Sequence, residues 1–179
     1  MSLLAITGDV LGCGKTLAMV YYGLRNMHIH KRVVYSNFPV NFKVNGRIVG
    51  KAKMIKEPME ITKLKNGAFL GDELWAWLDS RNFGKKSNIV KSKILLSSRK
   101  KELHIFYTAQ GLDQMEKRVR NITDFEAVPT ITANKEWCIV TVYQLSRSKR
   151  VRVIKKFKFK AKPIFDMYDT NYIIDFGDD

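Results

Sequence analysis

A glycine-rich stretch near the start of the chain constrains the fold more than any other feature. Gly8 to Gly14 separates a short apolar run, Leu3 to Thr7, from a segment whose apolar residues recur at three- and four-residue spacing. The run that ends at glycines predicts a buried strand, and the periodic segment predicts a helix at about Lys15 to Ile29. A helix in this position normally crosses over to a parallel strand. We therefore expect Arg32 to Ser36 to form a second strand, the parallel partner of the first.

The alternation of strand and helix patterns continues beyond the second strand. Further buried strands are predicted at Ala68 to Asp72 and Leu103 to Thr108, with one helix after the first of them and another near Asn88 to Glu102. Residues 37–61 are interpreted as an inserted ribbon, because Val44-Asn45-Gly46-Arg47 is a good hairpin turn. This order of elements is typical of an α/β domain built on an open, mainly parallel sheet.

Beyond Asp124 the pattern changes to strands alone. Glu136 to Leu145 and Arg150 to Lys160 are β-rich, and the four residues between them, Ser146 to Lys149, predict the basic tip of an antiparallel hairpin. The acidic end leaves two alternatives open: an ordered strand near Tyr172 to Ile174 with a frayed terminus, or disorder throughout.

Length and composition fit one compact core and exclude several classes of protein. The 179 residues are 45% hydrophobic, which excludes a disordered or collagen-like chain. No apolar run approaches the ~18 residues of a membrane span and no basic leader is present, so we expect neither a membrane-spanning nor a secreted protein. Cys13 and Cys138 alone build neither a disulfide framework nor a zinc site. The predicted organisation is a core at 1–124, with its inserted hairpin at about 37–61, and a β-rich extension at 125–179.

The charge of the chain favours a polyanionic partner. Thirty-two Lys and Arg against 17 Asp and Glu give a net charge of +15. Residues 81–101 hold eight basic side chains and residues 145–162 hold nine, without one acidic residue in either run. One such run is usually solvated surface, but two in so short a chain indicate nucleic acid. We expect the basic hairpin to contact the phosphates of such a partner rather than its bases, through Arg147, Lys149, Arg150, Arg152, Lys155 and Lys156.

The glycine-rich stretch also carries the strongest chemical signal. It ends in Lys and Thr where the helix begins, and in this it resembles the P-loop of nucleotide-binding proteins. Backbone N–H groups and the positive helix end can surround phosphate oxygens, while the lysine neutralises charge and the threonine hydroxyl ligates Mg²⁺. The residues expected to bind ATP are Gly12, Cys13, Gly14, Lys15 and Thr16, with Thr16 also a ligand of Mg²⁺.

The loop departs from the usual spacing at one position. Asp9 stands where G-x-x-x-x-G-K-[ST] has its first glycine, so a loop that starts at Gly8 is one residue longer. A carboxylate among phosphates would repel the ligand. We therefore expect Asp9 to point away and the extra residue to bulge near Val10 or Leu11.

Three polar residues at the ends of predicted strands complete a candidate catalytic site. Asp72 is expected to hold Mg²⁺, and Glu73 to polarise the attacking water. Gln110, after the strand Leu103 to Thr108, is expected to sense the γ-phosphate or to orient water. The alternative for Asp72 and Glu73 is that the two carboxylates simply suit the dipole at a helix N-terminus. The alternative for Gln110 is an ordinary loop residue.

Two arginines are candidates for a finger that reaches the nucleotide of a neighbouring subunit. Asp113 has the pattern of a helix start, and the short helix is expected to end in Lys117-Arg118-Val119-Arg120. Arg118 and Arg120 point to different faces, so at most one acts as a finger. Cations that simply suit a helix end are an equally good interpretation.

Together these segments resemble a known group, the P-loop ATPases of the FtsK-HerA superfamily. Within it the chain is most similar to the small genome-packaging ATPases of membrane-containing viruses, especially archaeal ones, and to the zonula-occludens-toxin-like assembly ATPases of filamentous phages. The resemblance covers roughly Leu3 to Asp124. Its carriers are Gly8 to Thr16, Phe69 to Glu73, Trp77 to Arg81, Ser98 to Lys101, Phe106 to Gln110, Arg118 and Arg120.

The resemblance implies a fold, an activity and partners. The fold would be a RecA-like three-layer sandwich, and the activity Mg²⁺-dependent ATP hydrolysis that moves double-stranded DNA through a homo-oligomeric ring, expected to be a hexamer. Capsid or membrane vertex proteins are further implied partners, in the host cytoplasm or at the packaging vertex of the virion. The alternatives are a virion-assembly or extrusion ATPase, a P-loop kinase of a small acceptor, and a nucleotide-binding module without turnover; Glu73 argues against the last.

Overall fold

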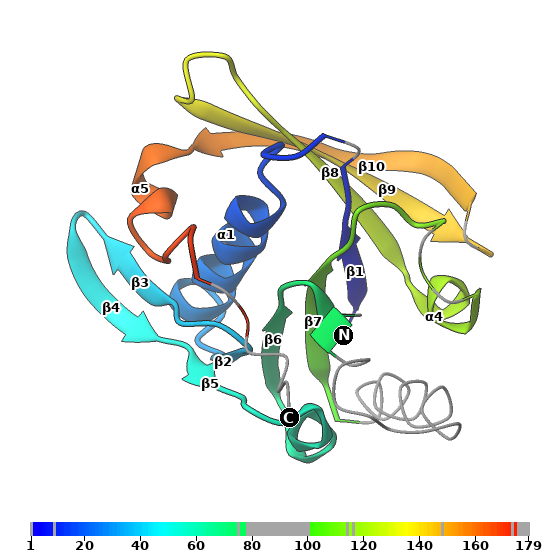
Figure 1. The fold of residues 1–179 in the computed structure, drawn as a ribbon, viewed down its shortest axis with the longest axis horizontal. Coiled ribbons are helices and arrows are strands. Elements are labelled where there is room, and N and C mark those ends of the chain that lie inside the picture. The colour runs from blue at the N-terminus through cyan, green and yellow to red at the C-terminus, as the bar shows by residue number, and fades with distance from the viewer. Residues whose placement is uncertain are drawn as a thin grey trace.

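The computed structural model describes residues 2–8, 10–74, 76–77, 101–113, 115, 117–147, 149–172 and 174, and residue 118 by its backbone alone. Within this part of the chain, eight strands form one sheet in the order β10-β9-β8-β1-β7-β6-β2-β5 (Figure 1). The strands are β1 (Leu3–Ile6), β2 (Val33–Ser36), β5 (Lys53–Met54), β6 (Gly67–Gly71), β7 (Leu103–Thr108), β8 (Phe125–Ile131), β9 (Trp137–Ser146) and β10 (Lys149–Lys160).

The sheet is parallel except at one edge. β8, β1, β7, β6, β2 and β5 pair in parallel, whereas β9 pairs antiparallel with both β8 and β10. The hairpin between β9 and β10 turns at Ser146 and Lys149, which face each other. This confirms the predicted α/β fold with a mainly parallel sheet and a C-terminal antiparallel hairpin. The hairpin is continuous with the central sheet, because β8 joins it to β1.

The strand order differs from the prediction at β2. β2 is parallel to β1 as expected, but it pairs with β5 and β6 instead, with Val34 opposite Ala68. The prediction that the first two strands are partners is therefore wrong. The crossover through α1 (Lys15–His28) passes over two positions that β6 and β7 fill. The local sequence pattern does not specify which later strands fill them.

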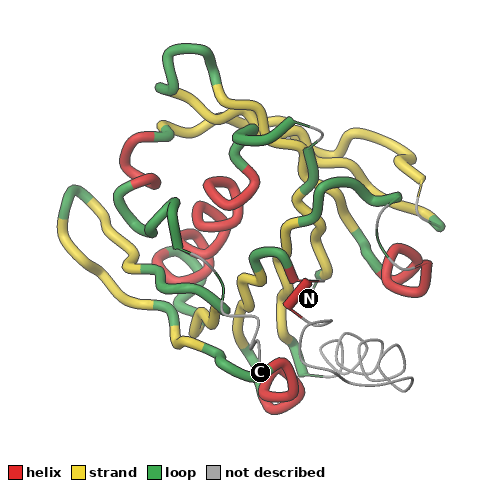
Figure 2. The backbone as a smooth tube through the Cα atoms, in the orientation of Figure 1, coloured by secondary structure: helices red, strands yellow, loops and turns green. Residues whose placement is uncertain are grey.

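Two hydrophobic cores lie on opposite faces of the sheet. The elements that cover the two faces give three layers with the sheet in the middle (Figure 2). Alternate residues of β1 divide between the two cores: Leu4 and Ile6 pack with α1, and Leu3 and Ala5 pack with the other face. The α1 face also carries the hairpin of β3 (Asn41–Val44) and β4 (Arg47–Lys51) and the short helix α5 (Lys162–Phe165). The opposite face carries the 3₁₀ helix η1 (Pro58–Lys63) and α4 (Lys117–Ile122).

α1 lies close to the sheet because its inward face is apolar and contains a glycine. Leu17 and Val20 are fully buried. A Cβ at Gly23 would lie 2.7 Å from Leu70 Cδ1, so a larger residue would push the helix outward. The ring of Tyr21 stacks on Phe159 of β10 at a centroid distance of 4.0 Å, which ties the helix to the C-terminal hairpin.

The inserted segment contains the predicted hairpin and more. Val44 faces Arg47 across a turn in which Asn45 and Gly46 have φ angles of 50° and 76°, as a tight hairpin turn requires. The turn prediction is confirmed. The rest of the segment is not ribbon, since β5 joins the central sheet and η1 packs beneath it.

Three other expectations differ from the structure or lie outside the described residues. α4 spans Lys117–Ile122, so the helix continues past residues 117–120, where it was expected to end. Of the expected strand at residues 172–174, Tyr172 and Ile174 are described; neither lies in a strand, and Ile174 is buried. The side chains of the basic run at 81–100 and most of the expected helix at 88–102 lie outside the described residues.

Candidate functional site

The loop from β1 to α1 has the backbone that its glycines allow. Gly12 and Gly14 have φ angles of 76° and 100°, and α1 begins directly after Gly14. The amide of Cys13 donates to Val10 O at 3.3 Å, and this turn exposes Val10 and Leu11, where the bulge is predicted. Asp9 lies outside the described residues. A Cβ at Gly8 would collide with Cys13 Sγ, so the Cys13 side chain would have to move to accept a larger residue there.

Lys15 connects the loop to the end of β7. Its Nζ donates to Gly8 O at 3.4 Å and to Gln110 Oε1 at 3.2 Å. The Gly8 amide in turn donates to Gln110 O at 3.3 Å. The structure thus brings Lys15 and Gln110 together at the carboxyl edge of the sheet, the edge where the sequence predicts both.

Thr16 and Asp72 face each other at the same edge. Thr16 Oγ1 lies 3.2 and 3.1 Å from the two Asp72 carboxylate oxygens, and Thr108 Oγ1 donates to Asp72 Oδ1 at 2.7 Å. Burial raises the pKa of Asp72, although the hydroxyls of Thr108 and Thr16 and the charge of Lys15 oppose the shift. A hydroxyl and a carboxylate at this separation can share one divalent cation, and that cation would stabilise the ionised carboxylate.

Glu73 is held by its backbone. Its φ angle is 42°, which is unusual for a residue other than glycine, and its amide donates to Thr108 Oγ1 at 2.9 Å. The Thr108 hydroxyl therefore contacts both residues. It accepts from the backbone amide of Glu73 and donates to the side-chain carboxylate of Asp72. Burial, followed by the negative charge of Asp72, raises the pKa of the Glu73 carboxyl. A carboxyl with a raised pKa is suited to accepting a proton.

A cavity of about 380 Å³ lies over the loop and collects the predicted residues. Glu73 and Gln110 line it together with Gly12, Cys13, Gly14, Lys15 and Thr16. Asp72 and Thr16 line a smaller adjoining cavity of about 110 Å³. The arrangement offers a phosphate cradle, a metal-binding pair and a carboxylate within one site.

Sequence reasoning missed two residues that position this site. Thr108 is the last residue of a predicted strand, and its contacts with two carboxylate residues become visible only in the structure. Asn37 follows β2 and brackets the Asp72 backbone: Asp72 N donates to Asn37 Oδ1 at 2.9 Å, and Asn37 Nδ2 donates to Asp72 O at 2.8 Å. The signal for both was a polar residue at the carboxyl end of a strand, the same signal that singled out Asp72.

The candidate arginine finger Arg120 lies outside the cavity over the glycine-rich loop. It lines a second cavity of about 330 Å³ beside Thr7 and Gly8. Its Nε is buried without a hydrogen-bond partner in the described part of the chain. The side chain of Arg118 is among those not described. Neither role as a finger is tested by this single chain.

A buried ion pair lies beside that second cavity. Glu126 of β8 is 2% exposed and accepts from Arg150 Nε at 2.5 Å and Nη2 at 2.9 Å. Thr7 Oγ1 donates to the same carboxylate at 2.6 Å. Arg150, from the basic hairpin, thereby balances the charge of the Glu126 carboxylate. The same carboxylate contacts Thr7, the residue that precedes the glycine-rich loop.

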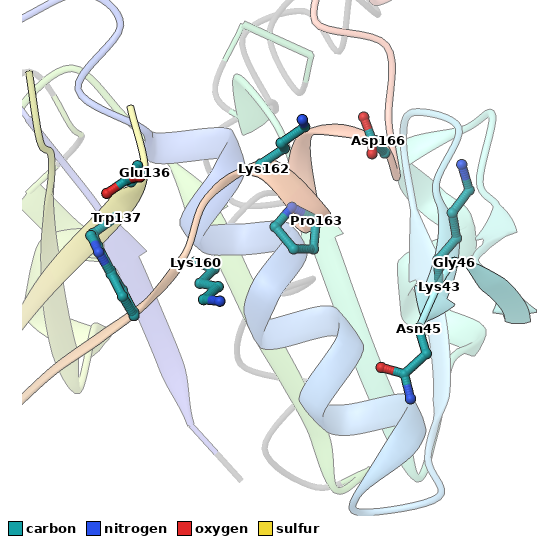
Figure 3. A pocket seen from close by; sticks show the side chains of 9 residues that line it. All are labelled: Lys43, Asn45, Gly46, Glu136, Trp137, Lys160, Lys162, Pro163 and Asp166. Carbon is teal, nitrogen blue, oxygen red and sulfur yellow. The ribbon is translucent and has the colours of Figure 1, made fainter. Parts of the chain in front are cut away.

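A larger cavity lies elsewhere (Figure 3). It has a volume of about 670 Å³ and lies between the β3–β4 turn, the start of β9 and α5. Its walls carry Lys43, Lys160 and Lys162, but also Glu136 and Asp166. It contains none of the predicted site residues, so size alone would have misplaced the site.

No family model matches this sequence, and no curated protein matches it. Solved structures do match. The N-terminal domain of zonular occludens toxin from Neisseria meningitidis superposes with a TM-score of 0.52 and 16% identity, over 94% of this chain and 100% of that chain. The genome packaging NTPase B204 from Sulfolobus turreted icosahedral virus 2, in complex with ATP-gammaS, superposes with a TM-score of 0.53 and 14% identity, over 86% of this chain and 97% of that chain. B204, the DNA-packaging ATPase from Sulfolobus Turreted Icosahedral Virus, superposes with a TM-score of 0.51 and 13% identity, over 86% of this chain and 97% of that chain. The chain shares the fold of these proteins.

The likeness confirms the resemblance predicted from the sequence. The matched structures include both groups that the sequence resembles. At these identities the likeness shows the fold alone. None of the described helices is long and apolar enough to cross a membrane.

Proposed function

We propose that this protein is a Mg²⁺-dependent ATPase that moves double-stranded DNA, with packaging of a viral genome into its capsid as the task. The observation that carries the proposal is the convergence of Lys15, Thr16, Asp72, Glu73 and Gln110 on the two adjoining cavities at the carboxyl edge of the sheet. Asp72 and Glu73 follow β6, Gln110 follows β7, and Lys15 and Thr16 begin α1, at the sheet edge where ligands of open α/β sheets bind.

The residues fit ATP and Mg²⁺ in their chemistry. Lys15 would exchange its carbonyl partners for phosphate oxygens, and Thr16 and Asp72 would hold the metal. Bound Mg²⁺ would neutralise charge on the phosphates. Glu73 would accept the proton of the attacking water, and Gln110 would orient that water or sense the terminal phosphate.

The matched proteins and the charge of the chain support DNA as the substrate of movement. B204 is a genome packaging NTPase and DNA-packaging ATPase, and structures of it hold ATP-gammaS or AMPPCP. β10 of this chain presents mostly exposed basic side chains along one sheet edge. A basic NTPase with such an edge fits a motor better than a kinase of a small acceptor.

A virion-assembly or extrusion ATPase is the second candidate. It is favoured by the match to zonular occludens toxin, whose N-terminal domain is covered completely. The two candidates share nucleotide chemistry and differ in their response to DNA.

Phosphate release by the purified protein, with and without double-stranded DNA, tests the proposal. We expect Mg²⁺-dependent release that duplex DNA stimulates. Release without any response to DNA would favour the assembly candidate, and transfer of phosphate to an acceptor instead of water would favour a kinase.

If the protein forms a ring in which one subunit supplies an arginine finger to its neighbour, a separate expectation follows for Arg118 and Arg120. Arg120→Ala or Arg118→Ala should bind ATP normally and hydrolyse it poorly, and mixing with Lys15→Ala subunits should restore part of the activity. Rescue requires a site composed of two subunits. Full activity in a strictly monomeric preparation would remove the need for a finger.

The basic hairpin is the proposed DNA contact, and the ion pair to Glu126 changes how this contact is tested. Neutralising Arg150 would also leave a buried carboxylate unpaired, so the clean variant replaces Arg147, Lys149 and Lys156 and keeps Arg150. Each lost phosphate contact should flatten the slope of log affinity against log salt by about 0.9 on duplex DNA. An unchanged slope with poorer solubility would instead indicate lysines that protect an edge strand.

A further inference from the structure

The far wall of the nucleotide cavity is built by the chain after β10. Phe165, Tyr168 and Thr170 line the same cavity as the glycine-rich loop, together with Ile131 at the end of β8 and Lys135 from the connection between β8 and β9. None of these residues belongs to a motif that the sequence analysis singled out. The cavity therefore has a second half that the P-loop chemistry does not use.

This wall is anchored to the rest of the molecule. Tyr168 forms a β-bridge with Val40, and its ring meets Phe38 edge to face at a centroid distance of 6.4 Å. One residue earlier, Met167 O accepts from Asn41 N at 2.8 Å. Tyr168 is largely buried, and this burial raises the pKa of its hydroxyl. The aromatic rings thus sit on a fixed support, as a preformed ligand site requires.

The two halves of the cavity differ in chemistry. The loop half carries Lys15, the Thr16 hydroxyl and Glu73, which suit phosphates and a metal. The other half carries the rings of Phe165 and Tyr168, the aliphatic Ile131, and Thr170 and Lys135 as polar groups. A nucleoside triphosphate has the same division, with a polyanionic end and an aromatic, hydrogen-bonding end.

We propose that Phe165 and Tyr168 form the base-binding wall of the nucleotide site, with Thr170 and Lys135 as polar contacts to the nucleoside. This rests on the proposed nucleotide-binding function and adds the part of the ligand that its motifs leave unassigned. The cavity of about 380 Å³ lies within the size range of small-molecule sites. Aromatic side chains bind bases by stacking, because every base has a π face.

The test compares ATP with inorganic tripolyphosphate, which has the phosphates but no nucleoside. Affinities for both, with Mg²⁺, are measured calorimetrically on Phe165→Ala and Tyr168→Leu. We expect ATP binding to weaken by about fivefold or more, the lower end of what base stacking contributes, while tripolyphosphate binding stays within about twofold. Both ligands are measured on the same preparation, so a smaller folded fraction affects both alike and leaves their ratio intact.

Three controls separate this inference from the function on which it rests. Tyr172→Ala removes an aromatic ring of the same segment that lines only the smaller cavity, and should leave the ratio unchanged. Tyr168→Phe keeps the ring and should retain ATP binding. Lys15→Ala should weaken both ligands. If both ligands bind the parent protein but Phe165→Ala and Tyr168→Leu do not change the ratio of the ATP affinity to the tripolyphosphate affinity, the proposed base-binding wall is wrong. The proposed P-loop function would then still stand. If the parent binds neither ligand, the proposed function fails and the wall fails with it.

Discussion

Replacing Arg150 with alanine should destabilise the protein far more than its exposed position suggests. The change leaves Glu126, 2% exposed, without its bidentate partner. Loss of one partner from a buried pair typically destabilises by about 3–5 kcal/mol. Arg150 is itself 50% exposed, so water can reach the carboxylate once the arginine is gone, and the Thr7 hydrogen bond remains. We therefore expect a loss of about 2–3 kcal/mol in the free energy of unfolding, or about 5–10 °C in Tm for a chain of this size.

Urea unfolding and thermal melts measure this loss against two controls. Arg152→Ala, on the same strand, removes a single exposed hydrogen bond to Gln144 Oε1 and should lose less than about 1 kcal/mol. Adding Glu126→Gln to Arg150→Ala removes the buried charge, keeps an oxygen acceptor for Thr7, and should recover at least about 1 kcal/mol. Equal losses in Arg150→Ala and Arg152→Ala, with no recovery in the double variant, would refute the reasoning that the pair neutralises a buried charge.

Three further predictions concern the site. Lys15→Ala should abolish ATP binding, whereas Glu73→Gln should keep binding and lose turnover by about 100-fold or more, as calorimetry and phosphate release would show; turnover at the parental rate would remove Glu73 from its role. A raised carboxyl pKa means that ionisation destabilises the nucleotide-free fold as the pH rises through that pKa. Asp72→Asn should therefore melt at a higher temperature than the parent at pH 7 without Mg²⁺, and should lose the stabilisation that Mg²⁺ with ATP gives; a lower Tm would contradict it. Gly14→Ala would force a Cβ into a residue at φ 100° and to within 2.9 Å of Ile131 Cγ1, so urea unfolding should show a loss of about 1–3 kcal/mol; no loss would mean that the loop relaxes freely.

The parts of the fold and site that could be predicted are those with a local signature. Gly8 to Thr16 predicts a strand, a loop and a helix because each residue type there has few backbone or chemical alternatives. Asp72 and Glu73 follow an apolar run, and parallel strands bring their carboxyl ends to one edge. The turn at Asn45-Gly46 is equally local, since two consecutive positive φ angles favour these residues.

The rest depends on contacts between distant segments. The position of β2 beside β6 depends on which later strands fill the middle of the sheet, and no residue within β2 records it. β8 contains Pro129, and a proline argues against a strand in the sequence pattern. In the structure Pro129 is nevertheless a buried residue within β8. Tyr168 and Phe165 reach the glycine-rich loop only because β8, β9 and β10 bring the chain back across it. A single aromatic residue after a basic run has no sequence signature for that position.

The unequal edges of the sheet bear on how copies of this chain can assemble. One edge strand, β5, has two residues, and the other, β10, has twelve. If two β10 strands were to pair, their cationic side chains would face each other at a strand spacing of about 4.8 Å, where like charges directly opposite are unfavourable. Besides Arg150, these are Lys149, Arg152, Lys155, Lys156, Lys158 and Lys160. Pairing of two copies of this chain through their β10 strands is therefore disfavoured, and a symmetric dimer would have to use another surface.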